Sequence, residues 1–268
     1  MSEQQRFAIV TGAAGGIGRE LVLGLLGNGL RVAAVDRTAQ GLAELAEAVQ
    51  QRQQGANLMT IEADLARDEA IDEIVAKARG RFGAIDILVN NAGVFLGMSL
   101  EEATLADWHR LCGVNLTGVF LGTKLSAPAL RESGQRSAHG SAIVNLASVA
   151  GLVGSSNDPL YSMTKGGVTL FTKSAALEFA RKGYRIRVNS IHPGTIDTDM
   201  GDQVLAIRAR NLGTNDLAPA RRQTLERIPI GRMGTVTDIA KGIVFLASDD
   251  AGFMTGAGLV VDGGITAQ

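Results

Sequence analysis

A glycine-rich turn near the N-terminus constrains the fold of this chain more than any other feature. Residues 7–10 form a short apolar run, and the turn Thr11-Gly-Ala-Ala-Gly-Gly-Ile-Gly18 follows it directly. Gly12, Gly16 and Gly18 allow the backbone to turn sharply from a strand into a helix and to approach a pyrophosphate at the helix N-terminus. Their spacing is G-x-x-x-G-x-G rather than G-x-G-x-x-G. An ordinary glycine-rich turn is the alternative, but we expect the start of a nucleotide-binding α/β unit.

Apolar strands and helical segments alternate along the whole chain. The expected strands are residues 7–10, 31–35, 58–63, 85–89, 141–146, 185–191 and 259–261. The expected helices are residues 17–26, 42–49, 70–82, 105–130, 159–181 and 236–248. This alternation predicts a doubly wound α/β fold, a parallel sheet with helices on both faces. The chain has no internal repeat or linker, so we expect residues 1–268 to form a single domain.

One polar segment, residues 199–232, interrupts this alternation. A long interruption in a compact domain is usually a lid or a binding segment. We therefore expect this segment to cover a binding site.

Composition excludes several classes of protein. The net charge is −1, which gives no electrostatic basis for binding nucleic acid or an anionic membrane. Cys112 is the only cysteine, so no internal disulfide can form, and a reducing compartment fits. We find no metal-ligand spacing, no apolar run of the ~20 residues that span a bilayer, and no signal-peptide core. The sequence therefore predicts a cytoplasmic protein.

An acidic residue follows the second expected strand. Asp36 stands eighteen residues after Gly18, where a carboxylate accepts hydrogen bonds from ribose hydroxyls and repels a 2′-phosphate. Arg37 follows and is able to hold such a phosphate instead, and Asp36 has the simpler alternative of capping a turn. We predict NAD rather than NADP as the cofactor.

Other strand ends supply further candidates for contacts with that cofactor. The residues after the third strand are placed to contact the adenine amino group. Those after the fourth strand lie at the switch point of the sheet, where ligands bind. Those after the sixth strand are placed to meet the nicotinamide amide and the phosphates. Ordinary turn chemistry is the alternative interpretation for each. The expected contacts are Ile17 in the glycine loop and Asp64, Leu65, Asn91, Ala92, Gly93, Pro193, Gly194, Ile196 and Thr198.

A tyrosine and a lysine in the long helix 159–181 point to proton transfer. Tyr161 and Lys165 are four residues apart and share one helix face, and Ser148 precedes Tyr161 by thirteen residues. A free phenol has a pKa of about 10, and a nearby cation lowers it toward the range of a general acid/base. Ser148 is suited to hold a carbonyl oxygen. Asn115 occupies an unfavourable mid-helix position, which indicates a local role or a buried structural amide, and we interpret His192 as structural.

Together these residues resemble the short-chain dehydrogenase/reductase family over nearly the whole chain. The resemblance implies one Rossmann-like sheet of strand order 3-2-1-4-5-6-7 and a homotetramer. It implies that Tyr161 is the acid/base, that Lys165 holds the nicotinamide ribose, that Ser148 orients the substrate oxygen, and that Asn115 supports a proton relay through water. Tyr161 and Lys165 therefore also count as cofactor contacts.

Within that family the chain looks most like bacterial alcohol and hydroxysteroid dehydrogenases. The resemblance implies hydride transfer between NAD(H) and a secondary alcohol or ketone. Small and apolar residues after Ser148, such as Leu152 and Val153, suit an apolar substrate. The alternatives are a 3-oxoacyl-type carbonyl reductase and a catalytically idle NAD-binding scaffold. The intact Tyr161 and Lys165 argue against a scaffold, which needs only the glycine loop.

Overall fold

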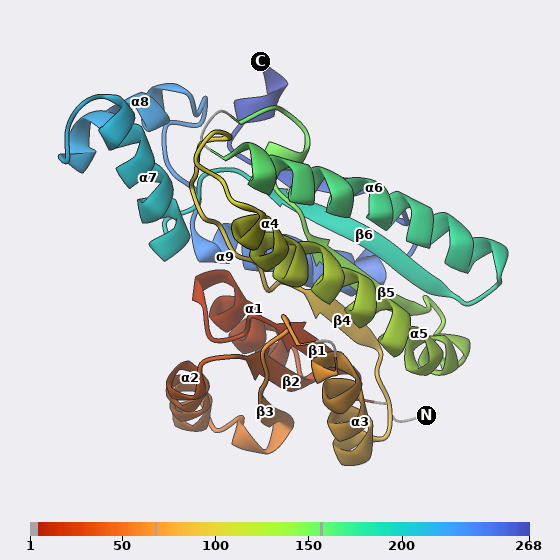
Figure 1. Cartoon of the computed structure of the whole chain (residues 1–268). Coiled ribbons are helices and arrows are strands. Elements are labelled where there is room, and N and C mark those ends of the chain that lie inside the picture. Colours follow the sequence, from red (N-terminus) through yellow and green to blue (C-terminus); the bar gives the residue numbers. More distant parts are fainter. Residues whose placement is uncertain (1–4, 68, 156–157) are drawn as a thin grey trace.

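Seven parallel strands form the centre of the molecule (Figure 1). The computed structural model describes residues 5–67, 69–155 and 158–268. The strands are β1 (Phe7–Thr11), β2 (Arg31–Asp36), β3 (Leu58–Glu62), β4 (Ile87–Asn90), β5 (Ser141–Leu146), β6 (Ile186–Pro193) and β7 (Gly258–Val261). Their order is β3-β2-β1-β4-β5-β6-β7 and every neighbouring pair is parallel, which confirms the predicted topology.

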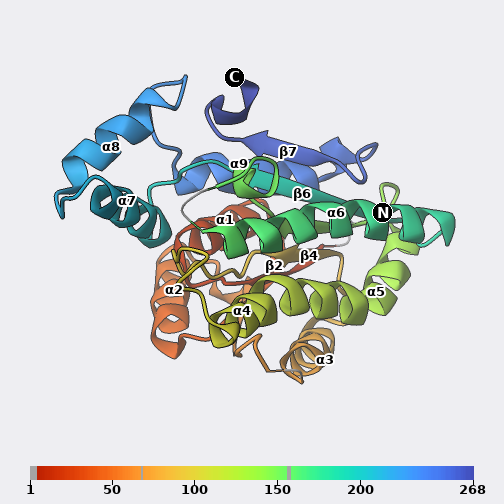
Figure 2. The same ribbon diagram turned by 45° about the horizontal axis from the view of Figure 1, so that its top comes forward.

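Helices cover both faces of this sheet, so strand residues alternate between two hydrophobic cores (Figures 1 and 2). Ala8 and Val10 of β1 pack with helices α1 (Gly16–Gly27), α2 (Ala39–Gln51) and α9 (Val236–Ala247). Phe7 and Ile9 pack on the other face with α3 (Ala70–Phe82), α5 (Gly118–Arg136) and α6 (Pro159–Arg181). Burial on both faces explains why the strands are nearly continuously apolar.

The helix that we expected over residues 105–130 is interrupted. The structure has α4 (Leu105–Cys112), then a π-helical stretch (Gly113–Thr117), and then α5, which continues to Arg136. A π-turn inserts one residue into the helical spacing without breaking the helix. Apolar periodicity does not reveal such an insertion, and here it falls around Asn115, whose side chain is fully buried.

The segment 199–232 folds into two helices rather than a loop. They are α7 (Asp199–Asn211) and α8 (Leu217–Glu226), and they lie at one end of the sheet in both ribbon views (Figures 1 and 2). Leu205, Ile228 and Met233 are buried together as a small separate core. The segment therefore has its own packing and does not belong to either sheet-facing core.

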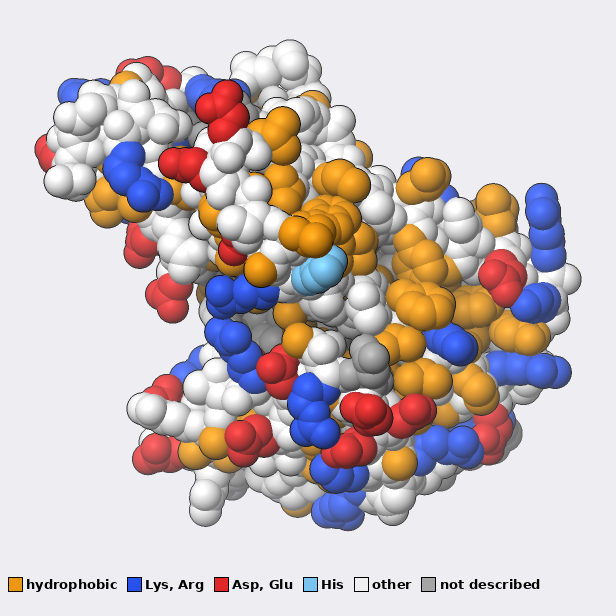
Figure 3. Space-filling model, in the orientation of Figure 1, with side chains coloured by type: hydrophobic (Ala, Val, Ile, Leu, Met, Phe, Trp, Pro, Cys, Tyr) orange, Lys and Arg blue, Asp and Glu red, His pale blue; other side chains and the backbone are white. Residues whose placement is uncertain are grey.

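The outer side of α5 and α6 carries large apolar side chains that remain exposed. Phe120, Met163, Leu170 and Leu177 are 47%, 63%, 66% and 57% exposed. Apolar side chains are also plentiful on this side in the space-filling view (Figure 3). We refer to Phe120, Met163, Leu170 and Leu177 as the α5–α6 patch.

In the described ranges no helix combines the length and the apolarity needed to cross a bilayer.

Candidate active site

The glycine loop is fastened to the loop that follows β4. The hydroxyl of Thr11 accepts hydrogen bonds from the backbone N–H groups of Asn91 and Ala92, each at 3.1 Å. The side-chain amide of Asn91 donates to the carbonyl oxygens of Thr11 and Gly12, each at 2.9 Å. A Cβ at Gly12 would lie 2.8 Å from the Ala92 Cα, and one at Gly18 would lie 2.0 Å from the Gly12 oxygen. Both positions therefore accept only glycine.

Beside this loop lies a cavity that gathers many of the cofactor residues predicted from the sequence. Its lining includes Gly12, Asp36, Arg37, Asp64, Leu65, Ala92 and Gly93. The Asn91 Oδ1 atom is buried nearby and has no hydrogen-bond partner among the described residues. A ligand with a pyrophosphate and a ribose fits such a site, because backbone N–H groups at a helix N-terminus bind phosphate and a carboxylate binds ribose hydroxyls.

Asp36 combines the two roles that we considered for it. Its carboxylate accepts hydrogen bonds from the backbone N–H groups of Ala14 and Thr38, each at 3.0 Å, so it does cap the turn. It also lines the cavity together with Arg37. The two backbone bonds fix the carboxylate at the end of β2, where a ribose would meet it.

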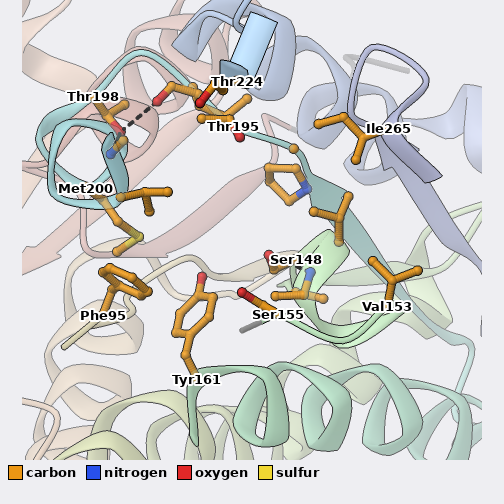
Figure 4. Close-up of a pocket in the computed structure, with 18 of the residues that line it drawn as sticks. Phe95, Ser148, Val153, Ser155, Tyr161, Thr195, Thr198, Met200, Thr224 and Ile265 are labelled. Atoms are coloured by element: carbon orange, nitrogen blue, oxygen red, sulfur yellow. Dashed lines mark hydrogen bonds between the residues drawn. The ribbon is translucent and has the colours of Figure 1, made fainter. Parts of the chain in front are cut away.

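A second cavity lies at the ends of β5 and β6, and α7 and α8 cover it. It is lined by Ser148, Tyr161, Pro193, Gly194, Ile196 and Thr198 among others. Figure 4 shows the hydroxyls of Tyr161 and Ser148 beside one another, with Phe95, Met200, Val153 and Ile265 around the same space. Two hydroxyl groups thus face an otherwise largely apolar cavity, which we call the alcohol cavity after the substrate class that the sequence analysis leads us to expect.

The nicotinamide-side residues meet the glycine loop at the edge of this cavity. A Cβ at Gly16 would lie 3.1 Å from the Thr198 Cγ2 atom. The Thr198 hydroxyl accepts a hydrogen bond from the Gly201 N–H at 3.2 Å and caps α7. Ile17, Ile196 and Thr198 all line the alcohol cavity. The structure therefore brings the start of α1 and the start of α7 together, as one extended ligand would require.

The electrostatics of Tyr161 differ from our expectation. Burial raises the pKa of Tyr161 to about 12, a hydrogen bond with Ser148 opposes this rise, and the charge of Asp158 adds to it. Lys165 Nζ lies 5.6 Å from the centroid of the Tyr161 ring and donates to the Leu146 carbonyl at 2.7 Å. Burial lowers the pKa of Lys165 to about 8. In the protein alone, burial rather than the lysine charge therefore determines the pKa of the phenol.

His192 is structural, and it holds the backbone of Ser148. Its ring is fully buried, and its Nδ1 atom lies 3.2 Å from the Ser148 carbonyl oxygen. Because a carbonyl only accepts, we assign the proton to Nδ1, and Nε2 then accepts from the Ser190 hydroxyl at 2.9 Å. Burial lowers the pKa of His192, which agrees with a neutral ring. The Ser148 hydroxyl in turn accepts from the Ala150 N–H at 3.1 Å.

Both the oxygen and the nitrogen of the Asn115 side-chain amide form hydrogen bonds, and these reach two other elements of the fold. Its Oδ1 atom accepts from the Val94 N–H at 2.8 Å, and its Nδ2 atom donates to the Val94 carbonyl at 3.0 Å and the Thr164 hydroxyl at 3.1 Å. The side chain thus connects the loop after β4 with α6. The predicted proton relay would have to use another part of Asn115, and it stays a prediction.

Asp158 is a site residue that the sequence analysis did not identify. It is 1% exposed, and its carboxylate accepts from the Tyr161 N–H and the Gly97 N–H, each at 2.9 Å. It thereby caps α6 and attaches the loop that carries Phe95, whose ring lies edge-on to Tyr161 at 5.3 Å. An acidic residue followed by proline at a helix start is a recognisable N-cap signal that would have indicated it.

Comparisons with known proteins agree with this geometry. The profile of a family described as Enoyl-(Acyl carrier protein) reductase, of the short-chain type, matches residues 12–266. A trans-4-hydroxycyclohexanecarboxylate dehydrogenase of Sinomonas cyclohexanicum is 37% identical and covers 98% of this chain and 93% of its own. An NADP-dependent (R)-specific alcohol dehydrogenase of Lentilactobacillus kefiri is 36% identical, over 98% of this chain and 97% of its own.

A solved structure shows the same fold. The crystal structure of levodione reductase superposes with a TM-score of 0.89 at 32% identity and covers 98% of both chains. The match thus includes the sheet, the glycine loop and both cavities rather than one motif. This chain belongs to the short-chain dehydrogenase/reductase family, whose members related to it are oxidoreductases that act on alcohols with a nicotinamide cofactor.

Proposed function

We propose that this protein interconverts a secondary alcohol and its ketone, with NAD as the preferred cofactor. The observation that carries this proposal is the placement of the Ser148 and Tyr161 hydroxyls side by side in the alcohol cavity. The cavity continues to Ile17, an expected cofactor contact of the glycine loop, and to Ile196 and Thr198, which are expected to meet the nicotinamide amide and the phosphates. Bound there, the nicotinamide would supply the hydride acceptor for oxidation and the hydride donor for reduction.

The residues of this chain provide for the proton and the substrate oxygen. In reduction, the Tyr161 hydroxyl donates its proton to the ketone oxygen while hydride reaches the carbonyl carbon. In oxidation the same oxygen of Tyr161 takes the proton of the alcohol. Ser148 donates a hydrogen bond that orients the substrate oxygen. Lys165 lies beside the phenol ring and is a cation near neutral pH. Because Tyr161 has a raised pKa, the protein alone holds it as the acid.

The preference for NAD depends on Asp36. Two backbone N–H groups fix its carboxylate in the cavity beside the glycine loop. A fixed negative charge repels a 2′-phosphate more effectively than a mobile one. Arg37 lines the same cavity and is the residue that would favour NADP. A relative at 36% identity is named as NADP-dependent, and a solved 3-ketoacyl reductase at 30% identity is complexed with NADH, so the family uses both cofactors.

Two other activities remain as competing hypotheses. A 3-oxoacyl-type carbonyl reductase would use the same catalytic residues, and assays with 3-oxoacyl thioesters beside simple ketones distinguish it. An idle NAD-binding scaffold would turn over neither class of substrate. Ser148 and Tyr161 line one cavity and Lys165 lies beside the Tyr161 ring, which favours an enzyme over a scaffold.

Replacing Tyr161 by phenylalanine should remove the proton donor and leave the cavity otherwise unchanged. We expect turnover of an active ketone to fall by about 10²–10⁴-fold, while NADH binding measured by fluorescence stays close to that of the wild type. Tyr184→Phe is the matched control, because Tyr184 stacks on Phe179 at 5.7 Å, outside the lining of the alcohol cavity. Near-normal turnover of the Tyr161→Phe variant would show that our assignment is wrong. Lys165→Ala should weaken both turnover and cofactor affinity.

Replacing Asp36 by alanine should shift the cofactor preference toward NADP, because the repelling charge is removed and Arg37 remains. The measurement is the ratio of kcat/KM for NAD to that for NADP. Asp36→Asn keeps the size of the side chain, and Arg37→Ala removes the competing cation. A wild-type enzyme that prefers NADP would contradict the proposal and assign the dominant role to Arg37.

The segment 199–232 is expected to act as a lid over the alcohol cavity, since Met200, Val204 and Arg208 of α7 line that cavity. Hydrogen exchange should slow across the segment when cofactor and an unreactive substrate analogue are both bound. Exchange that is unchanged there would count against a lid. Exchanging the segment for that of a relative should change the substrate range and preserve NAD binding.

We expect a homotetramer with two-fold axes, because two separate apolar surfaces need cover. One is the α5–α6 patch, and the other lies near the edge strand β7, where Phe253 is fully exposed and Val260 is 40% exposed. Light scattering should give four times the chain mass of 28.0 kDa. Leu170→Glu should reduce the assembly, whereas Leu212→Glu on the lid should not, and deleting residues 264–268 should loosen it. A wild-type mass near 28 kDa would refute the prediction.

A further inference from the structure

Two arginines line the alcohol cavity on the side formed by the lid segment. Met200, Val204 and Arg208 stand at positions i, i+4 and i+8 of α7, and all three line the cavity. This spacing places them on one face of the helix, with Arg208 about 12 Å along the axis from Met200. Arg227, directly after α8, lines the same cavity. The apolar wall near Met200 thus ends in two guanidinium groups.

The guanidinium of Arg208 is held in place. Its Nη1 atom donates to the hydroxyl of Thr224, which is 1% exposed, and that hydroxyl donates to the Ala220 carbonyl at 2.7 Å. Arg208 itself is half-buried and Arg227 is exposed. A half-buried guanidinium that a buried hydroxyl holds is positioned before any ligand arrives, so it loses little side-chain entropy on binding one.

Neither arginine has a carboxylate partner in the part of the chain that the structure describes. The ion pairs of this region join Arg221 to Asp197 and Arg232 to Asp238. Burial, and then the like charge of Arg227, lower the pKa of Arg208. Two neighbouring positive groups at the wall of a cavity therefore stand without a balancing negative charge, an arrangement that an anionic ligand would stabilise.

We propose that the alcohol or ketone substrate carries an oxyanion group, separated from the reacting carbon by an apolar portion, and that Arg208 and Arg227 bind it. The inference rests on the proposed function, because it assigns the reacting end of the substrate to Ser148 and Tyr161. The apolar residues between the two ends, Met200 and Val204 among them, accept the middle of the molecule. A guanidinium binds a carboxylate through two parallel hydrogen bonds, which fixes the substrate as well as attracting it.

The test compares keto acids with their primary amides, which keep the shape and lose the charge. We would measure kcat/KM with NADH for 5-oxohexanoate and 7-oxooctanoate and for the corresponding amides. The wild type should prefer at least one carboxylate by about tenfold or more. In the double variant Arg208→Met, Arg227→Met this ratio should fall to about one. Arg222→Met is the matched control, since Arg222 is an exposed arginine of α8 outside the cavity lining, and it should keep the wild-type ratio.

A binding measurement separates this inference from the proposed function. Calorimetry with NADH present should show hexanoate binding more tightly than hexanamide to the wild type and equally weakly to the double variant. Turnover of the amides without a preference for the acids, or an unchanged preference in the double variant, would overturn the inference while the proposed function stands. If neither acids, amides nor cyclohexanone are reduced, the proposed function fails, and the calorimetry still decides whether the arginines bind an anion.

Thermal stability distinguishes recognition from a structural role. If the arginines only support the lid, the double variant should melt earlier and keep the carboxylate preference, which would contradict the inference. Should the double variant not fold, the single variants Arg208→Lys and Arg227→Met provide the same comparison. Arg208→Lys keeps the charge and loses the paired donors, so the preference should be reduced and not abolished.

Discussion

The site depends on the attachment of the glycine loop to the loop after β4. At this point β1 and β4 lie side by side, and the chain leaves them toward opposite sides of the sheet. This opens a crevice at the carboxyl ends of the two strands. Thr11 and Asn91 close the base of that crevice with four hydrogen bonds. Their contact leaves no room for a Cβ at Gly12 or Gly18, so the start of α1 can approach a ligand directly. Gly12 and Ala92 of this junction line the cavity beside the glycine loop, and Ile17 at the start of α1 lines the alcohol cavity.

Around the junction, buried polar contacts position the residues that we propose as catalytic. Asn90 donates to Asn145 at 2.8 Å, and Asn145 donates to Thr172 at 2.9 Å, which joins β4, β5 and α6 through the core. Asn115, Asp158 and His192 extend the same principle to Val94, to the start of α6 and to the backbone of Ser148. Buried polar groups are tolerated when they are satisfied, and satisfied networks impose a single geometry. Tyr161 and Ser148 therefore reach the cavity from a rigid frame.

Local patterns such as apolar runs, glycine spacing and strand ends predicted the strands and many of the residues that line the two cavities. The strand order came from the family resemblance, and the structure confirms it. The sequence did not predict the π-turn at residues 113–117, since an inserted residue leaves the apolar periodicity nearly unchanged. It did not identify Asp158, although an acidic residue directly before Pro159 is typical of a helix N-cap. Arg208 and Arg227 line one cavity because of how α7 and α8 pack at the end of the sheet, and no local sequence pattern encodes that arrangement. The sequence predicted a lowered pKa for Tyr161 from the nearby charge of Lys165, but it does not show how deeply the phenol is buried, and burial raises that pKa.

Burial moves the pKa values of Tyr161 and Lys165 apart, and both shifts have the same physical cause. The phenol is raised to a pKa of about 12 and the ammonium is lowered to about 8, because each charged form loses hydration in the same enclosed site. A phenolate beside an ammonium would regain part of that lost stabilisation, so proton loss from Tyr161 and proton retention by Lys165 favour each other. A positive charge entering the cavity would favour the phenolate, and a negative charge near Tyr161, such as that of Asp158, favours the neutral phenol that donates its proton to a ketone.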